Sequence, residues 1–137
     1  LGINRVQEFL NKIEYGNQTT SSNLDLYWSD FSLKISPLEQ VTLLKKFNTN
    51  EFHLNFQNVF SVKNAIKIAS TPNGNFYGKT GTGRVNGQDI NGWFIGYVET
   101  SDNSYYFATN IQSDSNATGK KAFEITSDIL KKLHIWN

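Results

Sequence analysis

One short run of the sequence, Lys79-Thr80-Gly81-Thr82-Gly83, combines a cation, two hydroxyls and two glycines. The lysine supplies a fixed positive charge, the threonines donate hydrogen bonds, and Gly81 lets a ligand lie flat against the backbone. These residue types favour a strand whose edge binds an anion and pairs with a peptide-like ligand. A purely structural interpretation stays open, in which the glycines mark a bulge or a close approach of another segment.

Two other kinds of site are weaker candidates. Residues 74–80 superficially resemble a phosphate-binding loop, but the run is one residue short, contains Phe76 and Tyr77, and leads into a predicted strand. The chain has no cysteine, and His53 and His134 have no second ligand at metal-binding spacing. We therefore expect no metal and no cofactor. A Ser-His-Asp triad stays open because its members need not be adjacent, although no Gly-x-Ser-x-Gly run is present.

The lysine run must be held by a sheet. Residues 76–85, 92–100 and 104–112 alternate aromatic or β-branched residues with small ones, and short turns separate them. This period of two predicts a three-stranded antiparallel meander with Lys79 in its first strand. Ser101-Asp102-Asn103 falls between the last two strands, so we interpret it as a hairpin turn.

Helices account for most of the remaining chain. Ser36, Pro37 and Glu39 form a predicted N-terminal cap with a capping box. The C-terminal helix carries an apolar stripe that we expect to be buried, made of Ala122, Ile125, Ile129 and Leu133. The predicted helices span residues 3 to about 15, 37 to about 47, roughly 59–70 and 119–133. Three helices, a meander and a final helix make an α+β pattern.

Composition limits the partners. The 137 residues, 38% of them hydrophobic, suffice for a single domain with a core. A net charge of +1 argues against nucleic acid or an anionic membrane surface as partner. No apolar stretch of about 18 residues is present, so we expect any membrane attachment to lie outside this chain. The chain begins at Leu1 and contains no methionine, so we expect it to be a piece of a longer protein.

A family resemblance rests on several motifs in order. Lys79-Thr80-Gly81 is identified as the third motif of the serine beta-lactamase and penicillin-binding-protein superfamily, and Tyr15-Gly16-Asn17 is similar to a hallmark of its class D branch. Residues 27–41, 92–99 and 106–110 also resemble that branch. The resemblance covers essentially the whole chain. It implies a beta-lactamase/transpeptidase-like fold, with helices packed on an antiparallel sheet, of which residues 1–137 are the C-terminal portion.

The family's nucleophile is missing from this sequence. In this superfamily it is the serine of a Ser-x-x-Lys motif, and no serine here has a lysine three positions later. The second motif should precede Tyr15, where only one helix is predicted. The resemblance therefore implies that serine and base lie upstream, outside this chain. We expect no turnover from the chain alone, and an open sheet edge that favours dimerisation or strand exchange.

The resemblance implies two functions, both with beta-lactam antibiotics as ligands. One is the extracellular sensor domain of a beta-lactam receptor-transducer that induces resistance in Gram-positive bacteria. The other is a secreted class D beta-lactamase, whose carboxylated lysine is held by a tryptophan that Trp28 matches. The neighbours of Trp28 are polar, such as Ser29, and residues 113–119 contain no arginine. Both features favour the sensor. A penicillin-binding transpeptidase is disfavoured by the motif at Tyr15.

The resemblance also implies roles for single residues. Lys79 would hold the proton network of the serine and attract the antibiotic carboxylate, while Thr80 and Thr82 donate hydrogen bonds to it. The strand at Gly81 to Thr82 would supply one N–H of the oxyanion hole and pair with the ligand amide. Trp28 and the loop Tyr15-Gly16-Asn17 would support the site from its edge.

Overall fold

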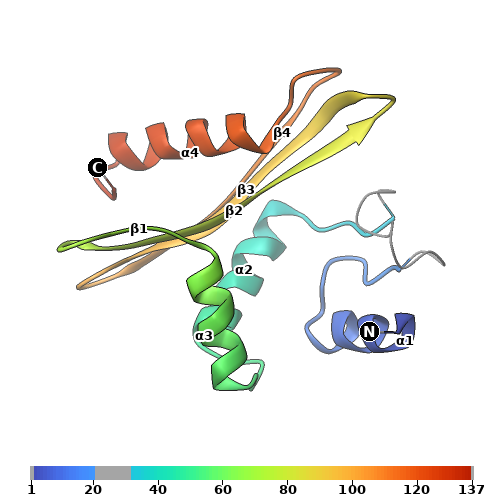
Figure 1. Cartoon of the computed structure of the whole chain (residues 1–137), viewed down its shortest axis with the longest axis horizontal. Coiled ribbons are helices and arrows are strands. Elements are labelled where there is room, and N and C mark those ends of the chain that lie inside the picture. The colour runs from blue at the N-terminus through green and yellow to red at the C-terminus, as the bar shows by residue number, and fades with distance from the viewer. Residues whose placement is uncertain (1, 21–31, 137) are drawn as a thin grey trace.

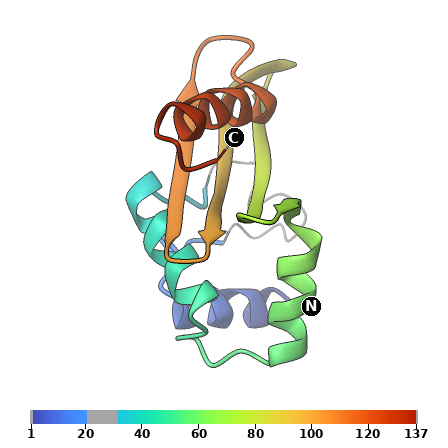
Figure 2. The same ribbon diagram turned by 90° about the vertical axis from the view of Figure 1, so that its left-hand side faces the viewer.

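The computed structural model describes residues 2–20 and 32–136. It contains a four-stranded antiparallel sheet in the order β1-β2-β3-β4. The strands are β1 (Lys67–Thr71), β2 (Gly74–Val85), β3 (Gln88–Thr100) and β4 (Ser104–Gln112). One helix, α4 (Gly119–Lys132), lies across one face of the sheet, while α2 (Pro37–Asn48) and α3 (Phe56–Ala65) lie on the other side (Figure 1, Figure 2). The first helix, α1 (Ile3–Lys12), lies farther out on that second side.

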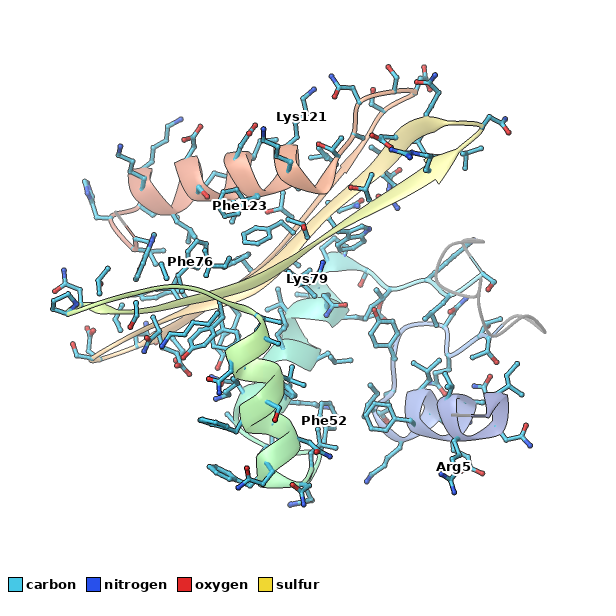
Figure 3. The ribbon with its side chains drawn as sticks, viewed as in Figure 1. Arg5, Phe52, Phe76, Lys79, Lys121 and Phe123 are labelled. Carbon is cyan, nitrogen blue, oxygen red and sulfur yellow. The ribbon has the colours of Figure 1, made fainter. Side chains whose placement is uncertain are left out.

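The apolar core fills the layer between the sheet and α4. Phe76, Phe94 and Val98 point to this face and are at most 3% exposed. Phe123 of α4 packs edge-on against Phe94, with ring centroids 5.0 Å apart. Figure 3 shows Phe76 and Phe123 on this side of the sheet and Lys79 on the side of α2. The alternation of β2 therefore separates core residues from the lysine.

One strand differs from the prediction. The expected helix over roughly 59–70 is present, but its bounds are wrong: α3 begins after Asn55 and ends at Ala65, and Lys67–Thr71 forms β1. The Asn55 side chain caps the helix by accepting from the N–H groups of Gln57 and Asn58. Pairing of β1 with β2, across the predicted turn at Pro72 and Asn73, overrides the local helical pattern. The meander therefore has four strands rather than three.

The C-terminal helix buries a different face from the one expected. In α4 the buried line is Gly119, Ala122, Thr126 and Leu130, whereas Ile125, Ile129 and Leu133 are 43–61% exposed. The Thr126 hydroxyl tolerates burial because it bonds Thr109 Oγ1 at 2.6 Å and the Ala122 carbonyl at 2.7 Å. In α2, Leu44 and Gln40 are buried, whereas Leu38 is 77% exposed.

The capping box at the start of α2 is confirmed. Glu39 N donates to Ser36 Oγ at 3.2 Å, and Ser36 N donates to the Glu39 carboxylate at 2.8 Å. The Ser36 hydroxyl also donates to this carboxylate at 2.7 Å, and this bond together with the one from Ser36 N lowers the pKa of Glu39 because both stabilise its charged form. The cap fixes where α2 starts and so where the preceding residues, 33–35, lie beside the sheet.

The sheet edge and the helices bear on the expected dimerisation and membrane attachment. β4 forms one edge of the sheet, so the expected dimerisation or strand exchange stays a prediction. Within residues 2–20 and 32–136, no helix combines the length and the apolar character needed to cross a lipid bilayer.

A cluster of tyrosines occupies the face opposite α4. Tyr77 and Tyr97 stack at 4.7 Å between centroids, and Tyr106 lies 5.7 Å from Tyr97. Asn48 Nδ2 donates to Tyr106 Oη at 2.9 Å and to Glu99 at 3.1 Å. Burial raises the pKa of Tyr97, whose hydroxyl has no hydrogen-bond partner among the described residues.

This cluster predicts unequal effects of removing two hydroxyls. Tyr97→Phe removes an unpartnered buried oxygen, so the free energy of unfolding should stay within about 0.5 kcal/mol or rise. Tyr106→Phe removes the acceptor of Asn48 and should cost about 1 kcal/mol. Urea unfolding followed by circular dichroism measures both. A larger loss for Tyr97→Phe would show that its hydroxyl is bonded in solution.

The N-terminus of α4 is pressed against β2. A Cβ atom built on Gly119 would lie 2.7 Å from the Gly81 carbonyl oxygen and 2.9 Å from Thr80 Cβ. Gly119 N also donates to Thr82 Oγ1 at 2.9 Å. Only glycine fits here, because both obstacles belong to a strand that β3 already holds in place.

We therefore expect Gly119→Ala to destabilise the fold. Helix propensity alone would favour alanine by up to about 1 kcal/mol, but the collision with β2 should reverse the sign and cost about 1–3 kcal/mol. Gly2→Ala is the matched control, since a Cβ there meets nothing within 4 Å. The midpoint of urea unfolding reports both changes. Stabilisation by Gly119→Ala would contradict the close packing of α4 on β2.

Candidate functional site

A hollow of about 870 Å³ lies beside the second half of β2. This volume falls within the range of small-molecule pockets, roughly 300–1,000 Å³. Its walls come from β2, β3, the end of β4 and the segments before α2. The described residues that line it are Tyr15, Leu33, Lys34, Ile35, Gln40, Lys79, Thr80, Gly81, Thr82, Gly83, Arg84, Ile90, Asn91, Trp93, Ile95 and Gln112.

The edge of β2 is open where it borders this hollow. β1 pairs only with Gly74–Tyr77, and Gly78 N donates to the Ile66 carbonyl at 2.8 Å on the same edge. Because N–H groups of a strand alternate between its two edges, those of Thr80 and Thr82 point to the edge of Gly78. Beyond Gly78, no described strand pairs with this edge. It can therefore accept an extended ligand as an added strand.

Lys79 lies at the start of the open edge. Its ammonium donates to the Thr80 carbonyl at 2.6 Å, which is the one hydrogen bond that its side chain makes to described residues. The side chain is exposed and lies on the α2 side of the sheet (Figure 3). An ammonium has three donors, so Lys79 can bind an anion while it keeps this contact.

The threonines are held from the opposite side. Thr82 Oγ1 accepts from Gly119 N at 2.9 Å, so its own proton remains to be donated. The N-terminus of α4 therefore orients the Thr82 hydroxyl. No side-chain hydrogen bond joins Thr80 to another described residue, and its exposed hydroxyl lies beside the hollow.

The loop Tyr15-Gly16-Asn17 ties two segments together at the rim. Asn17 donates from its backbone N to the Lys34 carbonyl at 2.9 Å, and its side chain accepts from Lys34 N at 2.9 Å. Gly16 has φ of +50°, and a Cβ there would lie 1.8 Å from the Lys34 carbonyl oxygen, so glycine is required. Tyr15 Oη reaches Gln40 at 3.3 Å and lines the hollow. Trp28 lies outside the described residues.

Ser101-Asp102-Asn103 is a hairpin turn, as predicted. It connects β3 and β4, and Asn103 N donates to Thr100 Oγ1 at 3.2 Å while that hydroxyl donates to Asp102 at 2.9 Å. The residues do not line the hollow.

Sequence reasoning missed the far wall of the hollow. Arg84, Asn91 and Gln112 lie there. The Asn110 side chain donates to Asn91 and accepts from Gln112 at 3.0 Å. Arg84 Nε donates to Asp89 Oδ1 at 2.7 Å, which raises the pKa of Arg84 and keeps it cationic. The sequence signal that could have found Arg84 is its position on the same predicted strand as Lys79.

Comparisons with known proteins identify the family of this chain. The family model of the penicillin binding protein transpeptidase domain matches residues 1–131. The methicillin resistance mecR1 protein of Staphylococcus aureus is 45% identical over 130 residues, which are 95% of this chain and 22% of that protein. The regulatory protein BlaR1 of Bacillus licheniformis is 46% identical over 136 residues, or 99% of this chain and 22% of that protein.

Solved structures show the same fold. The C-terminal domain of the Bacillus licheniformis BlaR penicillin-receptor matches with a TM-score of 0.93 and 45% identity, covering 99% of this chain and 55% of that one. A class D beta-lactamase from Bacillus subtilis matches with a TM-score of 0.89 and 37% identity, over 99% and 55% of the two chains. The chain thus spans about a fifth of these curated relatives and just over half of these solved structures.

The matches confirm the expected α+β fold, shared with class D beta-lactamases and with the BlaR penicillin-receptor domain. Since the family model extends over nearly all of the sequence, the chain belongs to the penicillin-binding protein transpeptidase domain family.

Proposed function

We propose that this chain is the C-terminal portion of the extracellular sensor domain of a beta-lactam receptor-transducer, and that it forms one wall of the antibiotic site. The observation that carries the proposal is the open edge of β2 at Thr80–Thr82, with Lys79 at its start. Identities of 45% and 46% to the mecR1 and BlaR1 proteins support the sensor. The serine that is acylated lies outside this chain, which has no Ser-x-x-Lys run.

The open edge suits a bicyclic amide that carries a carboxylate. Lys79 attracts the carboxylate, and the hydroxyls of Thr80 and Thr82 donate hydrogen bonds to it. The Thr82 N–H points at the edge, where it can polarise the lactam carbonyl as one donor of an oxyanion hole. The serine oxygen adds to that carbonyl, the lactam C–N bond breaks, and the ring nitrogen takes the proton that the hydroxyl loses. The product is an ester of the serine.

A class D beta-lactamase is the second candidate. The TM-score of 0.89 to the Bacillus subtilis enzyme favours it, because the same wall would serve acylation in either protein. The sensor is preferred because the probable beta-lactamase YbxI of Bacillus subtilis is 38% identical and the beta-lactamase OXA-48 of Klebsiella pneumoniae is 30% identical, both lower than the receptors. Residues 113–119 also contain no arginine.

The proposal places the domain on the outer face of a Gram-positive cell membrane, attached through a segment outside this chain. Beta-lactam antibiotics are its ligands, and the acyl ester is the signal for induction of resistance. In the beta-lactamase alternative the protein is secreted and the ester is hydrolysed.

The lifetime of the ester distinguishes the two functions. We expect the full-length protein that contains this sequence to form one benzylpenicillin adduct per molecule, stable for hours, in intact-protein mass spectrometry. Residues 1–137 alone should form none, because they lack the nucleophile motif. Rapid loss of the adduct, with many turnovers of nitrocefin, would make the protein a beta-lactamase and would refute the sensor.

The open edge predicts the effect of substitutions in the full-length protein. Lys79→Ala should lower the second-order rate constant of acylation by about 10²–10³-fold, because it removes a preorganised cation. Thr82→Val should lower it about tenfold, whereas Thr82→Ser keeps the hydroxyl and most of the rate. Lys131→Ala, on the exposed side of α4, is the control. Equal rates for Lys79→Ala and the control would exclude Lys79 from the site.

A further inference from the structure

The charges around the hollow are all of one sign. Its described lining contains three charged residues, Lys34, Lys79 and Arg84, and no aspartate or glutamate. The proposed carboxylate contact uses Lys79. Arg84 lies at the other end of the hollow, five residues farther along β2, and the proposed function gives it no role.

The pairing of β1 decides in which direction a ligand extends. The edge of β2 before Lys79 is occupied, because Gly78 N donates to the Ile66 carbonyl and β1 pairs with the residues before it. A ligand whose carboxylate lies at Lys79 can therefore extend only toward Gly83 and Arg84. Five residues of strand span about 16 Å, and the long side chains of Lys79 and Arg84 shorten the gap between their charges.

The guanidinium of Arg84 can take a second anion. Its side chain is 65% exposed. In the part of the chain that the structure describes, only its Nε is bonded, to Asp89 at 2.7 Å. Both terminal nitrogens therefore keep their donors, in the planar arrangement that suits a carboxylate. Asp89 does not line the hollow, and its carboxylate partly neutralises the Arg84 guanidinium from outside the hollow.

We propose that Arg84 makes this site select beta-lactams whose acylamido side chain carries an anionic group. The inference rests on the proposed function, because it takes the ligand carboxylate to lie at Lys79. It goes further in naming which antibiotics are recognised best: dianionic penicillins, with one carboxylate at Lys79 and the other at Arg84. Asp89 weakens this preference by competing for the same guanidinium.

Two matched antibiotics test the proposal. Carbenicillin differs from benzylpenicillin only by a carboxylate on the side-chain carbon, so the ratio of their second-order acylation rate constants isolates that group. In the full-length protein, Arg84→Gln should lower the ratio of carbenicillin to benzylpenicillin about threefold to tenfold. Arg84→Lys should keep most of it. Lys131→Gln, which removes the same charge outside the hollow, should leave the ratio unchanged.

A second variant acts in the opposite direction. Asp89→Asn frees Arg84 and should raise the ratio, and high salt should reduce the differences between all variants. Because the ratio is taken within one protein sample, partial unfolding of a variant cancels. An unchanged ratio in Arg84→Gln, with both antibiotics still forming esters, would overturn the inference and leave the proposed function intact. Failure of carbenicillin alone to acylate the wild-type protein would overturn only the inference, whereas failure of benzylpenicillin would overturn both.

Discussion

The site depends on the unequal lengths of two paired strands. β1 has 5 residues and β2 has 12, so β1 occupies the edge of β2 only as far as the contact between Gly78 and Ile66. The rest of that edge keeps backbone donors and acceptors that water or a ligand must satisfy. In many proteins such an edge is a liability. Here it lies in a hollow beside Lys79, so that in the proposed function strand addition and charge act on the same ligand.

The two faces of β2 divide structural and chemical tasks. Phe76 faces α4 and belongs to the core, whereas Lys79 faces the side of α2. Tyr77 follows Phe76 in the strand, so its side chain also points to the side of α2. Thr82 connects the two tasks, since its hydroxyl accepts from Gly119 at the start of α4 while its N–H points to the open edge. Packing of α4 against the sheet therefore orients Thr82, so a residue of the candidate site is held in place by the core.

Charge adds a direction to this geometry. The hollow is cationic at both ends, through Lys79 and Arg84, and the second of these is paired with Asp89. A single cation would attract any penicillin-like anion, whereas two cations at different points along an edge also read the far end of the ligand.

Local patterns in the sequence determined the capping box at Ser36, the three longer strands, the hairpin turn at Ser101–Asn103 and the family motif at Lys79. These features depend on neighbouring residues, which a pattern can show. Tertiary structure alone decided that Lys67–Thr71 is a strand, that α4 buries Thr126 rather than Ile125, and that Arg84 shares a hollow with Lys79. Each of these depends on contacts that a sequence period cannot show: β1 pairs with β2 across the turn at Pro72 and Asn73, Thr126 bonds Thr109 of β4, and the hollow is completed by segments far along the chain, such as Tyr15. Their contacts form only when the sheet is assembled, so no local pattern encodes them.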